Sequence, residues 1–347
     1  MRCIARRTVL GLSAALATAL TGVSPATAAD VTLRFHQLLP PQAAVPKNAI
    51  MPWIEQIQTA SNGRIKIQHF PAMQLGGKPP ELFDQAKNGV VDIVWTVLGY
   101  TPGRFPKAEV FELPFMTGDP VKGSVAFQNF VEQYAADEFK DIKLIAVHVH
   151  GPGLFHGKEP VTQLADLKGL KVRGGSRVVN IMLTQLGATP VGMPVPAVGQ
   201  ALSKGVIDST TIPYEIVPAL KLHQIVKNHT EFSGDKGLYT QTFVVAMNKG
   251  AYDKLPADLK KVIDDHSGAK TAALFGQAMA DGDKVGRGLI EKAGNKIVKL
   301  SAAETAPFKR QGQATRDAWV QEASKAGIDG AALIRAAESI IAQAESR

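Results

Sequence analysis

The sequence predicts an α/β protein built from two similar lobes. Short runs rich in β-branched residues alternate with segments whose apolar residues recur at helical spacing, a pattern typical of strands covered by helices. Two helix-to-strand joints are also alike, "KNGVVDIVW" over residues 87–95 and "SKGVIDSTT" over residues 203–211. Each joint has a glycine suited to ending a helix, two β-branched residues and then an aspartate. We therefore expect two α/β units whose strand ends line one cleft.

The first unit is expected to follow the order β-α-β-α-β, with a parallel sheet covered by helices. A helix should end near residue 61, where Asn62 and Gly63 stop it, and another should begin at Pro79 and Pro80. A further helix is predicted over residues 121–136. The predicted strands of this unit are residues 31–36, 65–69, 90–96 and 144–149.

The second unit repeats this alternation and is followed by a helical third. Strands are predicted over residues 170–173 and 188–191, and helices over residues 176–186, with Ser176 as N-cap, and 194–204. After a strand over 243–247, apolar spacing predicts one long helical stretch from about 255 to 293. That stretch is too long for one lobe and is expected to pack across both. A final helical region ends with residues 331–344.

An arginine ends the first strand of the second unit, in "LADLKGLKVRGGSR" over residues 164–177. Ligands of open α/β sheets bind outside the carboxyl ends of strands, where Arg173, Trp95 and Thr211 fall. A guanidinium matches both oxygens of a carboxylate, and the following Gly174 and Gly175 allow close approach to the backbone. The sequence thus predicts an anion site at Arg173. The alternative is an internal ion pair of this arginine with an aspartate, Asp166 or Asp208.

The N-terminal segment has the features of a secretory signal peptide. Arg2, Arg6 and Arg7 precede an apolar run over residues 9–23, and "ATAAD" offers cleavage near Ala28 or Ala29. We expect residues 1–29 to be removed on export to the periplasm. The pair Arg6-Arg7 leaves the twin-arginine route open beside the general one.

The composition excludes several classes of function. The one cysteine, Cys3, lies in the predicted signal peptide, so the mature chain is expected to have no disulfide, thiolate metal site or cysteine nucleophile. Three arginines leave with the signal peptide, which lowers the formal charge from +8 to +5. The basic residues are scattered, which argues against nucleic-acid binding. No apolar run in the mature chain reaches the ~20 residues of a membrane span.

Six motifs in order resemble the substrate-binding proteins of tripartite ATP-independent periplasmic (TRAP) transporters, the DctP-like family. They are "SNGRIKIQHFPAMQLGG", "NGVVDIVW", "FELPFM", "LADLKGLKVR", "LGATPVGMP" and "ALSKGVIDS". The resemblance implies a two-lobed type II periplasmic binding protein fold with a long helix bridging both lobes. On this basis residues 30–150 and about 239–278 form lobe I, and residues 151–238 and about 279–347 form lobe II.

The resemblance also implies a function and partners. Family members close around an organic acid and deliver it to the subunits of a membrane permease. The arginine of "LKGLKVR", here Arg173, grips the carboxylate of the ligand, and no cofactor is expected. The alternatives are a secreted α/β enzyme that acts on small carboxylic acids, or a receptor that serves a sensor kinase.

The chain departs from the sialic-acid branch of this family at pocket positions. Gly153, Leu154 and Phe155 stand where that branch has a second arginine, and Thr211 and its neighbours replace a Gln-Glu-Asn run. One fixed cation and aromatic walls suit a monocarboxylate with an apolar body, so an aromatic or a branched or 2-oxo acid is favoured. Ser176 and Thr211 are expected to donate hydrogen bonds. The expected pocket walls are Gln37, Trp95, Tyr100, Phe155, Tyr214 and Phe243. Ordinary core packing is the alternative for Trp95, Phe155, Tyr214 and Phe243.

Metal binding is the weakest of the chemical possibilities. His148 and His150 share one face of a strand with His156 nearby, but core or surface histidines are the expected explanation. Glu215 is a weak candidate for holding a cation beside the ligand. We expect no metal otherwise and no catalytic residue.

Overall fold

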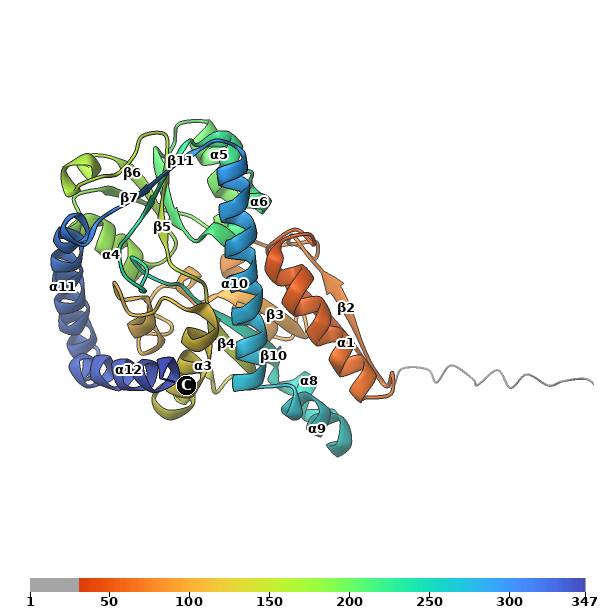
Figure 1. Cartoon of the computed structure of the whole chain (residues 1–347). Coiled ribbons are helices and arrows are strands. Elements are labelled where there is room, and N and C mark those ends of the chain that lie inside the picture. The colour runs from red at the N-terminus through yellow and green to blue at the C-terminus, as the bar shows by residue number, and fades with distance from the viewer. Residues whose placement is uncertain (1–30, 347) are drawn as a thin grey trace, which may run out of the picture.

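The computed structural model describes residues 31–346, so the predicted signal peptide lies outside the described residues. These residues form two sheets with helices around them, the α/β class that the sequence predicts (Figure 1). The first sheet has the order β2-β1-β3-β10-β4, and its strands are β1 (Val31–Gln37), β2 (Ile65–Phe70), β3 (Ile93–Val97), β4 (Ile142–Val149) and β10 (Thr242–Asn248).

The second sheet has the order β11-β9-β5-β8-β6-β7. Its strands are β5 (Leu154–Gly157), β6 (Lys171–Gly174), β7 (Thr189–Gly192), β8 (Ser209–Ile212), β9 (Asn228–Glu231) and β11 (Lys296–Lys299).

Both sheets are mixed, which corrects the expectation of purely parallel sheets. β1 pairs parallel with β2 and β3, but β10 runs antiparallel to β3 and β4. In the second sheet β6 is parallel to β7 and β8, whereas β5 is antiparallel to β8 and β9. The reason is that the chain crosses between the sheets after β4 and returns after β9, so β10 enters the first sheet from the opposite direction.

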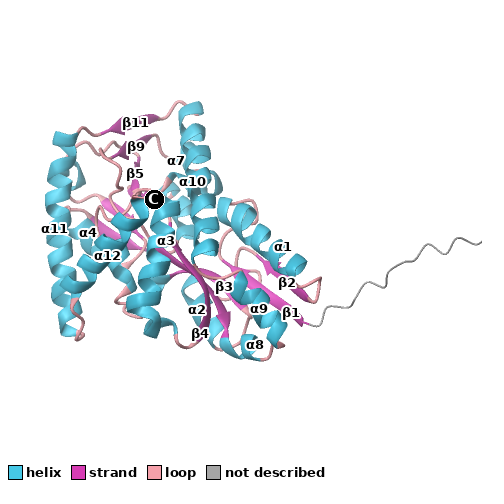
Figure 2. Ribbon diagram, turned by 60° about the horizontal axis from the view of Figure 1, so that its bottom comes forward, coloured by secondary structure: helices cyan, strands magenta, loops and turns pink. Residues whose placement is uncertain are grey.

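Helices lie around the two sheets, with α11 (Ala302–Lys325) at one edge of the molecule (Figure 2). Their bounds in chain order are α1 (Met51–Ala60), α2 (Leu82–Lys87), α3 (Pro120–Phe130), α4 (Arg177–Gln185), α5 (Val198–Ser203), α6 (Val217–Leu220), α7 (Leu222–Ile225), α8 (Lys249–Asp253), α9 (Ala257–Asp265), α10 (Ala269–Lys292), α11 (Ala302–Lys325) and α12 (Gly330–Glu345). None of the helices within residues 31–346 has the length and apolar character needed to span a membrane.

The helix α10 bridges the two lobes, as expected. It packs against α3 and β4 beside the first sheet and against α6 and β11 beside the second (Figure 1). The predicted continuous helix over residues 255–293 is wrong in one respect, because the chain breaks between α9 and α10. Gly268 takes a left-handed φ of 76° there, a conformation that a residue with a Cβ rarely adopts.

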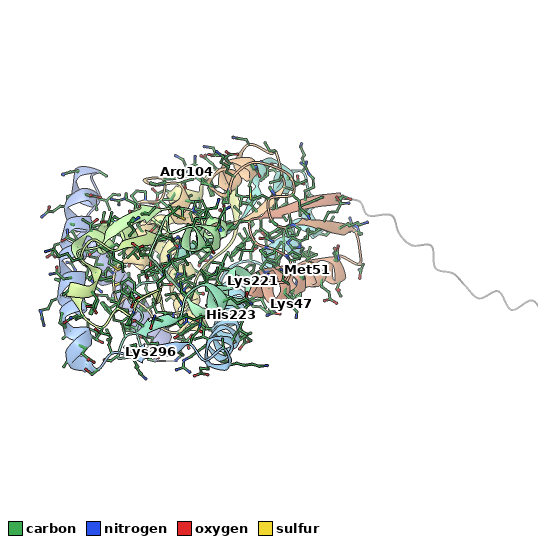
Figure 3. The ribbon with its side chains drawn as sticks, turned by 90° about the horizontal axis from the view of Figure 1, so that it is seen from above. Lys47, Met51, Arg104, Lys221, His223 and Lys296 are labelled. Atoms are coloured by element: carbon green, nitrogen blue, oxygen red, sulfur yellow. The ribbon has the colours of Figure 1, made fainter. Side chains whose placement is uncertain are left out.

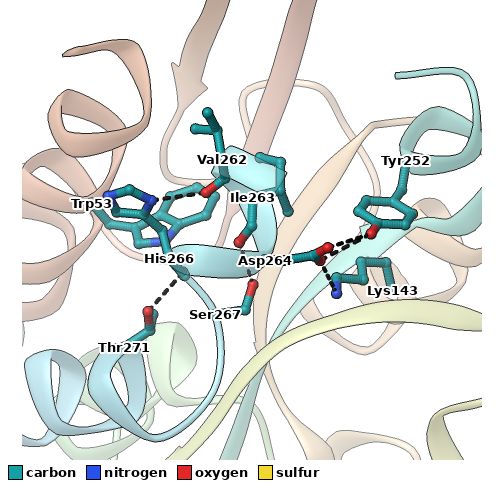
Figure 4. A network of polar contacts seen from close by, with 9 residues as sticks. All are labelled: Trp53, Lys143, Tyr252, Val262, Ile263, Asp264, His266, Ser267 and Thr271. Carbon is teal, nitrogen blue, oxygen red and sulfur yellow. Dashed lines mark hydrogen bonds and ion pairs between the residues drawn. The ribbon is translucent and has the colours of Figure 1, made fainter. Parts of the chain in front are cut away.

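A polar network fixes the first end of α10 to the first lobe (Figure 4). The carbonyl of His266 accepts from the indole Nε1 of Trp53 at 2.8 Å and from the hydroxyl of Thr271 at 2.7 Å. Nearby, Asp264 pairs with the Lys143 ammonium at 2.6 Å. The break before α10 is therefore held by residues of α1 and β4.

The other end of α10 is fixed to the second lobe. Asn295 donates to the carbonyls of His223 at 2.9 Å and Val226 at 3.1 Å. The chain turns sharply just before His223, at the exposed Lys221, whose φ is 55° (Figure 3). Because its two ends are tied to different lobes, α10 is expected to follow any change in their relative position.

The C-terminal helices lie along one side of the molecule (Figures 1 and 2). α11 packs against α4 beside the second sheet, and α12 packs against α3 beside the first. The lobe boundaries expected from the sequence assign residues 279–347 to lobe II, and α12 within this range packs against α3 beside the first sheet as well as against α11.

Candidate functional site

A small cavity lies where the two lobes meet. Its volume is about 40 Å³, and residues of both sheets, the crossing segments and α10 line it. The lining residues are Leu38, Leu39, Trp95, Val97, Tyr100, His150, Arg173, Val195, Ile212, Pro213, Glu215, Ile216, Gln241, Phe243 and Met279. A wider, open pocket of about 510 Å³ shares Tyr100 with this cavity and is lined by Gly174, Gly175 and Ser176.

Arg173 lies in the cavity wall with its charge unpaired. The side chain is 1% exposed, its Nε donates to the carbonyl of Met193 at 3.0 Å, and its Nη2 has no partner. Among the described residues no carboxylate lies within ion-pair distance of it. A buried charge without a counter-ion is strongly unfavourable. This arrangement therefore favours an anionic ligand at Arg173.

The two aspartates considered as internal partners are engaged elsewhere. Asp166 accepts from the amide and hydroxyl of Thr162, both at 2.8 Å. Asp208 accepts from the amide of Lys171 at 3.0 Å. In residues 31–346 neither forms an ion pair with Arg173, so the structure does not support the internal alternative.

Gly175 provides room for two polar side chains of the site. A Cβ at this position would overlap Oε1 of Gln241 and would lie 2.9 Å from Nη2 of Arg173. Gln241 is 4% exposed, and its Nε2 has no partner. The glycine after the strand end thus lets Gln241 and Arg173 lie together, and both present free donors to the cavity.

The apolar wall is a set of parallel rings. Trp95 and Phe243 stack with centroids 5.3 Å apart and planes within 2°, and His148 stacks on Phe243 at 4.8 Å. The indole Nε1 of Trp95 donates to Nε2 of His148 at 2.8 Å. Burial lowers the pKa of His148 to about 3, so this imidazole is a neutral acceptor. With the indole N–H satisfied, the wall offers flat apolar surface.

The structure brings four of the residues expected in the site into the cavity wall: Arg173, Trp95, Tyr100 and Phe243. Tyr100 connects the lobes, since its hydroxyl accepts from the amide of Val195 at 2.8 Å. Burial raises the pKa of this phenol, and the nearby charge of Arg173 opposes the shift. These residues come from three separate strands or their ends.

Five other expected site residues lie outside the cavity wall. Gln37 is buried but bonds to the backbone of Leu39, with its Nε2 donating to the carbonyl at 2.8 Å. Thr211 is also buried, and its hydroxyl donates to the carbonyl of Arg173 at 3.3 Å. Thr211 therefore holds the backbone of the strand that carries Arg173 and does not line the cavity.

The remaining three have structural contacts of other kinds. The Ser176 hydroxyl accepts from the amide of Val179 at 3.2 Å, which confirms this serine as the N-cap of α4. Phe155 packs in the second lobe's core, with its ring 6.0 Å from that of Phe232. The Tyr214 hydroxyl donates to Glu231 at 2.9 Å in a groove behind the cavity.

His150, Gln241 and Glu215 also line the cavity, although the sequence does not predict the first two as ligand-binding residues and suggests Glu215 only as a weak cation ligand. The Nδ1 of His150 lies 2.6 Å from the carbonyl of Gly151 and must donate to it. Burial lowers the pKa of His150 to about 4, so the ring is neutral and its partnerless Nε2 is an acceptor. His150 and Gln241 belong to the segments that cross between lobes, where no local pattern predicts a role.

Metal binding gains no support from the described residues. In residues 31–346 no three His, Cys, Asp or Glu side chains are placed to hold a metal ion together. His148 bonds to Trp95, and His156 bonds to His229 with their Nδ1 atoms 2.7 Å apart. Glu215 lines the cavity with its Oε1 lacking a partner.

Two lobes, a bridging helix and an interlobe cavity with one unpaired cation define a solute-binding protein for an organic anion. Residues 36–322 match the family described as bacterial extracellular solute-binding protein, family 7, and the chain belongs to this family. The resemblance expected from the six motifs is thereby confirmed.

Three similar solved structures are TRAP solute-binding proteins. One, from an unidentified marine microbe and specific for aromatic acid ligands, is 48% identical with a TM-score of 0.89 over 90% of this chain and 99% of its own. It was solved with metahydroxyphenylacetate and with 3-hydroxybenzoate. A second, from Rhodoferax ferrireducens with copurified benzoate, is 46% identical with a TM-score of 0.89, and the match covers 91% of this chain and 98% of its own. A third, from Bordetella bronchiseptica with bound mandelate, is 32% identical with a TM-score of 0.82, and the match covers 90% of this chain and 99% of its own.

Proposed function

We propose that this chain is the extracytoplasmic receptor of a TRAP transporter and that it binds an aromatic monocarboxylate between its lobes. The observation that carries the proposal is the buried, unpaired guanidinium of Arg173 in a cavity that also contains the stacked Trp95 and Phe243. A carboxylate would pair with the guanidinium fork, and an aromatic body would lie against the rings.

The donors near Arg173 support the carboxylate assignment. Nη2 of Arg173 and Nε2 of Gln241 are both buried without partners, and each can donate one hydrogen bond to a carboxylate oxygen. Solved relatives at 46% and 48% identity hold benzoate and 3-hydroxybenzoate. A branched or 2-oxo acid remains the second choice, since it lacks the flat ring that the wall favours.

Ligand entry requires the walls to separate. The cavity of about 40 Å³ is smaller than the cavities of ~150 Å³ that hold a benzene ring in proteins. The lobes must therefore open to admit an aromatic acid and close again around it. In this proposal the closed, liganded form is what the permease recognises.

The remaining parts of the proposal concern the cellular setting. Residues 1–29 direct export to the periplasm, the membrane permease receives the ligand, and the protein performs no catalysis. A sensor kinase as the recipient is the alternative partner. An enzyme that acts on small carboxylic acids is the alternative activity, and it would convert the bound acid.

A thermal-shift screen of the mature chain tests the proposal. The panel is benzoate, 3-hydroxybenzoate, mandelate, a branched 2-oxo acid, succinate and sialic acid. A ligand at 100 times its Kd stabilises by about 2.7 kcal/mol, enough to raise the melting temperature clearly. We expect aromatic acids to do so and succinate and sialic acid not to. Stabilisation by succinate alone, or recovery of a chemically altered acid, would overturn the proposal.

A further inference from the structure

Glu215 is a buried carboxyl group beside the ligand cavity. Binding of a carboxylate at Arg173 gives no role to it. It lies in the short helical turn η9 (Tyr214–Ile216), which follows β8, and its side chain is 5% exposed. It lines the same cavity as Arg173, and its Oε1 has no hydrogen-bond partner among the described residues. A buried polar atom of this kind is unfavourable unless a ligand or water satisfies it.

Glu215 and Arg173 reach the cavity from different elements. Arg173 belongs to β6, whereas Glu215 follows β8 and packs against α10. Burial, together with the neighbouring carboxylate of Asp283 on α10, raises the pKa of Glu215 to about 8. A ligand carboxylate would also be repelled by Glu215 when ionised. Glu215 is therefore suited to bind a part of the ligand other than its carboxylate.

The position of Glu215 is fixed by close packing on α10. A Cβ added to Gly282 would lie 2.6 Å from Cγ of Glu215, and one added to Gly286 would overlap the carbonyl of Tyr214. The amide of Glu215 donates to Oδ1 of Asp283 at 2.7 Å. Two glycines and one aspartate of the bridging helix thus hold the glutamate against the cavity, which makes it part of a built site.

We propose that Glu215 hydrogen-bonds a hydroxyl group that the ligand carries away from its carboxylate, so that hydroxylated aromatic acids are preferred over unsubstituted ones. The inference rests on the proposed function and specifies its substrate class. A carboxyl group both accepts from and, when protonated, donates to a phenolic hydroxyl. A site built to bind a hydroxyl discriminates against the analogue that lacks it, because the buried group is then left unpaired.

Titration calorimetry with benzoate and 3-hydroxybenzoate tests the inference. We expect the wild type to bind 3-hydroxybenzoate more tightly than benzoate. Glu215→Leu should weaken 3-hydroxybenzoate binding roughly 10- to 100-fold and leave benzoate binding equal or tighter. Glu215→Gln, whose amide can still donate and accept, should keep part of the preference.

The control is Glu138→Gln, which changes a glutamate held by the amides of Lys107 and Ala108 and absent from the cavity wall. It should bind both acids as the wild type does. EDTA should leave the preference unchanged, because the contact is direct and needs no bridging cation. A preference that requires added Ca²⁺ would contradict the direct hydrogen bond.

The outcomes separate the two proposals. If the wild type binds neither acid, the proposed function fails. If it binds both acids equally, the inference about Glu215 fails while the proposed function stands, and this result needs no variant that folds. If Glu215→Leu weakens both acids by the same factor, Glu215 has only a structural role and the inference is overturned.

Discussion

Arg173 and Gly175 are best understood together. Because Gly175 has no Cβ, Gln241 can approach the guanidinium of Arg173, so two donors without partners face the cavity. The glycine has an ordinary negative φ, so its function here is close approach and not a special backbone conformation.

Gly175→Ala is expected to impair binding more than folding. The added methyl group would collide with Gln241 and crowd Arg173, which should weaken aromatic-acid binding roughly 10-fold or more. Titration calorimetry measures the change. The matched control is Gly288→Ala, where a Cβ meets no atom within 4 Å. Equal affinity of the two variants would show that Gly175 does not shape the site.

At the residue scale the sequence predicts side chains that follow strands and misses those in crossing segments. Arg173 and Trp95 are predictable because each lies at or near the carboxyl end of a strand in a recognisable joint. His150 and Gln241 stand after β4 and before β10, and their convergence depends on how the chain returns to the first sheet. The family resemblance predicts Phe155 in the wall because it stands where the sialic-acid branch has a second arginine, but its strand β5 pairs on both sides and the ring packs in the core of the second lobe.

At the scale of elements, the turn η4 (Ala108–Glu112) of the first lobe contacts α4 of the second. Glu109 accepts from Nε of Arg177 at 3.2 Å and pairs with its Nη2, and Nη1 of Arg177 pairs with Glu322 of α11. A Cβ at Gly99 would overlap the side chain of Ser176. The lobes are therefore in close contact on this side of the cavity.

Arg177→Ala should favour the open form. Without Arg177 the carboxylate of Glu109 lacks its counter-ion in the closed form. This should raise the free energy of the closed form by about 1–2 kcal/mol and weaken ligand binding roughly 5- to 30-fold. Small-angle scattering should show a larger radius of gyration without ligand. Lys261→Ala, which removes an exposed pair with Asp265 inside α9, should change neither quantity. Unchanged affinity in Arg177→Ala would contradict a role in closure.

The strands β5, β9 and β11, which the sequence does not predict, are all four residues long. β9 reads Asn-His-Thr-Glu and β11 reads Lys-Ile-Val-Lys, and four residues are too few to establish a strand period. Their pairing with each other requires residues 228–231 and 296–299 to meet, which α10 brings about. Longer elements such as β1, β4 and α4 are predictable because each offers seven or more residues of apolar or β-branched character or of helical spacing.

For the whole molecule, buried ionisable groups should set the pH dependence of stability. Burial raises the pKa of Glu112, Glu138 and Asp283 to about 7 and that of Glu215 to about 8. It lowers the pKa of His148 to about 3 and those of His150 and His229 to about 4. Below about pH 6.5 the unfolded chain binds more protons at the histidines, while the folded chain binds more at the carboxyls, so the two effects oppose each other.

Above about pH 7.5 few histidines of the unfolded chain remain protonated, so the carboxyls account for most of the difference between the two states. The folded protein then holds more protons than the unfolded chain, so the free energy of unfolding should fall as pH rises from about 7.5 to 8.5. Chemical denaturation across this range measures it. Glu112→Gln, whose amide oxygen can still face Thr242, should flatten part of the decline. A free energy of unfolding that rises with pH in this window would contradict these pKa directions.

The central claim is that Arg173 anchors the ligand's carboxylate, and titration of benzoate into Arg173→Ala tests it most directly. Removing one partner of a buried, hydrogen-bonded charge pair costs roughly 2–5 kcal/mol, so binding should weaken about 30-fold to several thousand-fold. The unliganded variant should melt no lower than the wild type if the unpaired charge is unfavourable in the empty protein. Wild-type affinity in Arg173→Ala would show that the arginine is structural and that the carboxylate binds elsewhere.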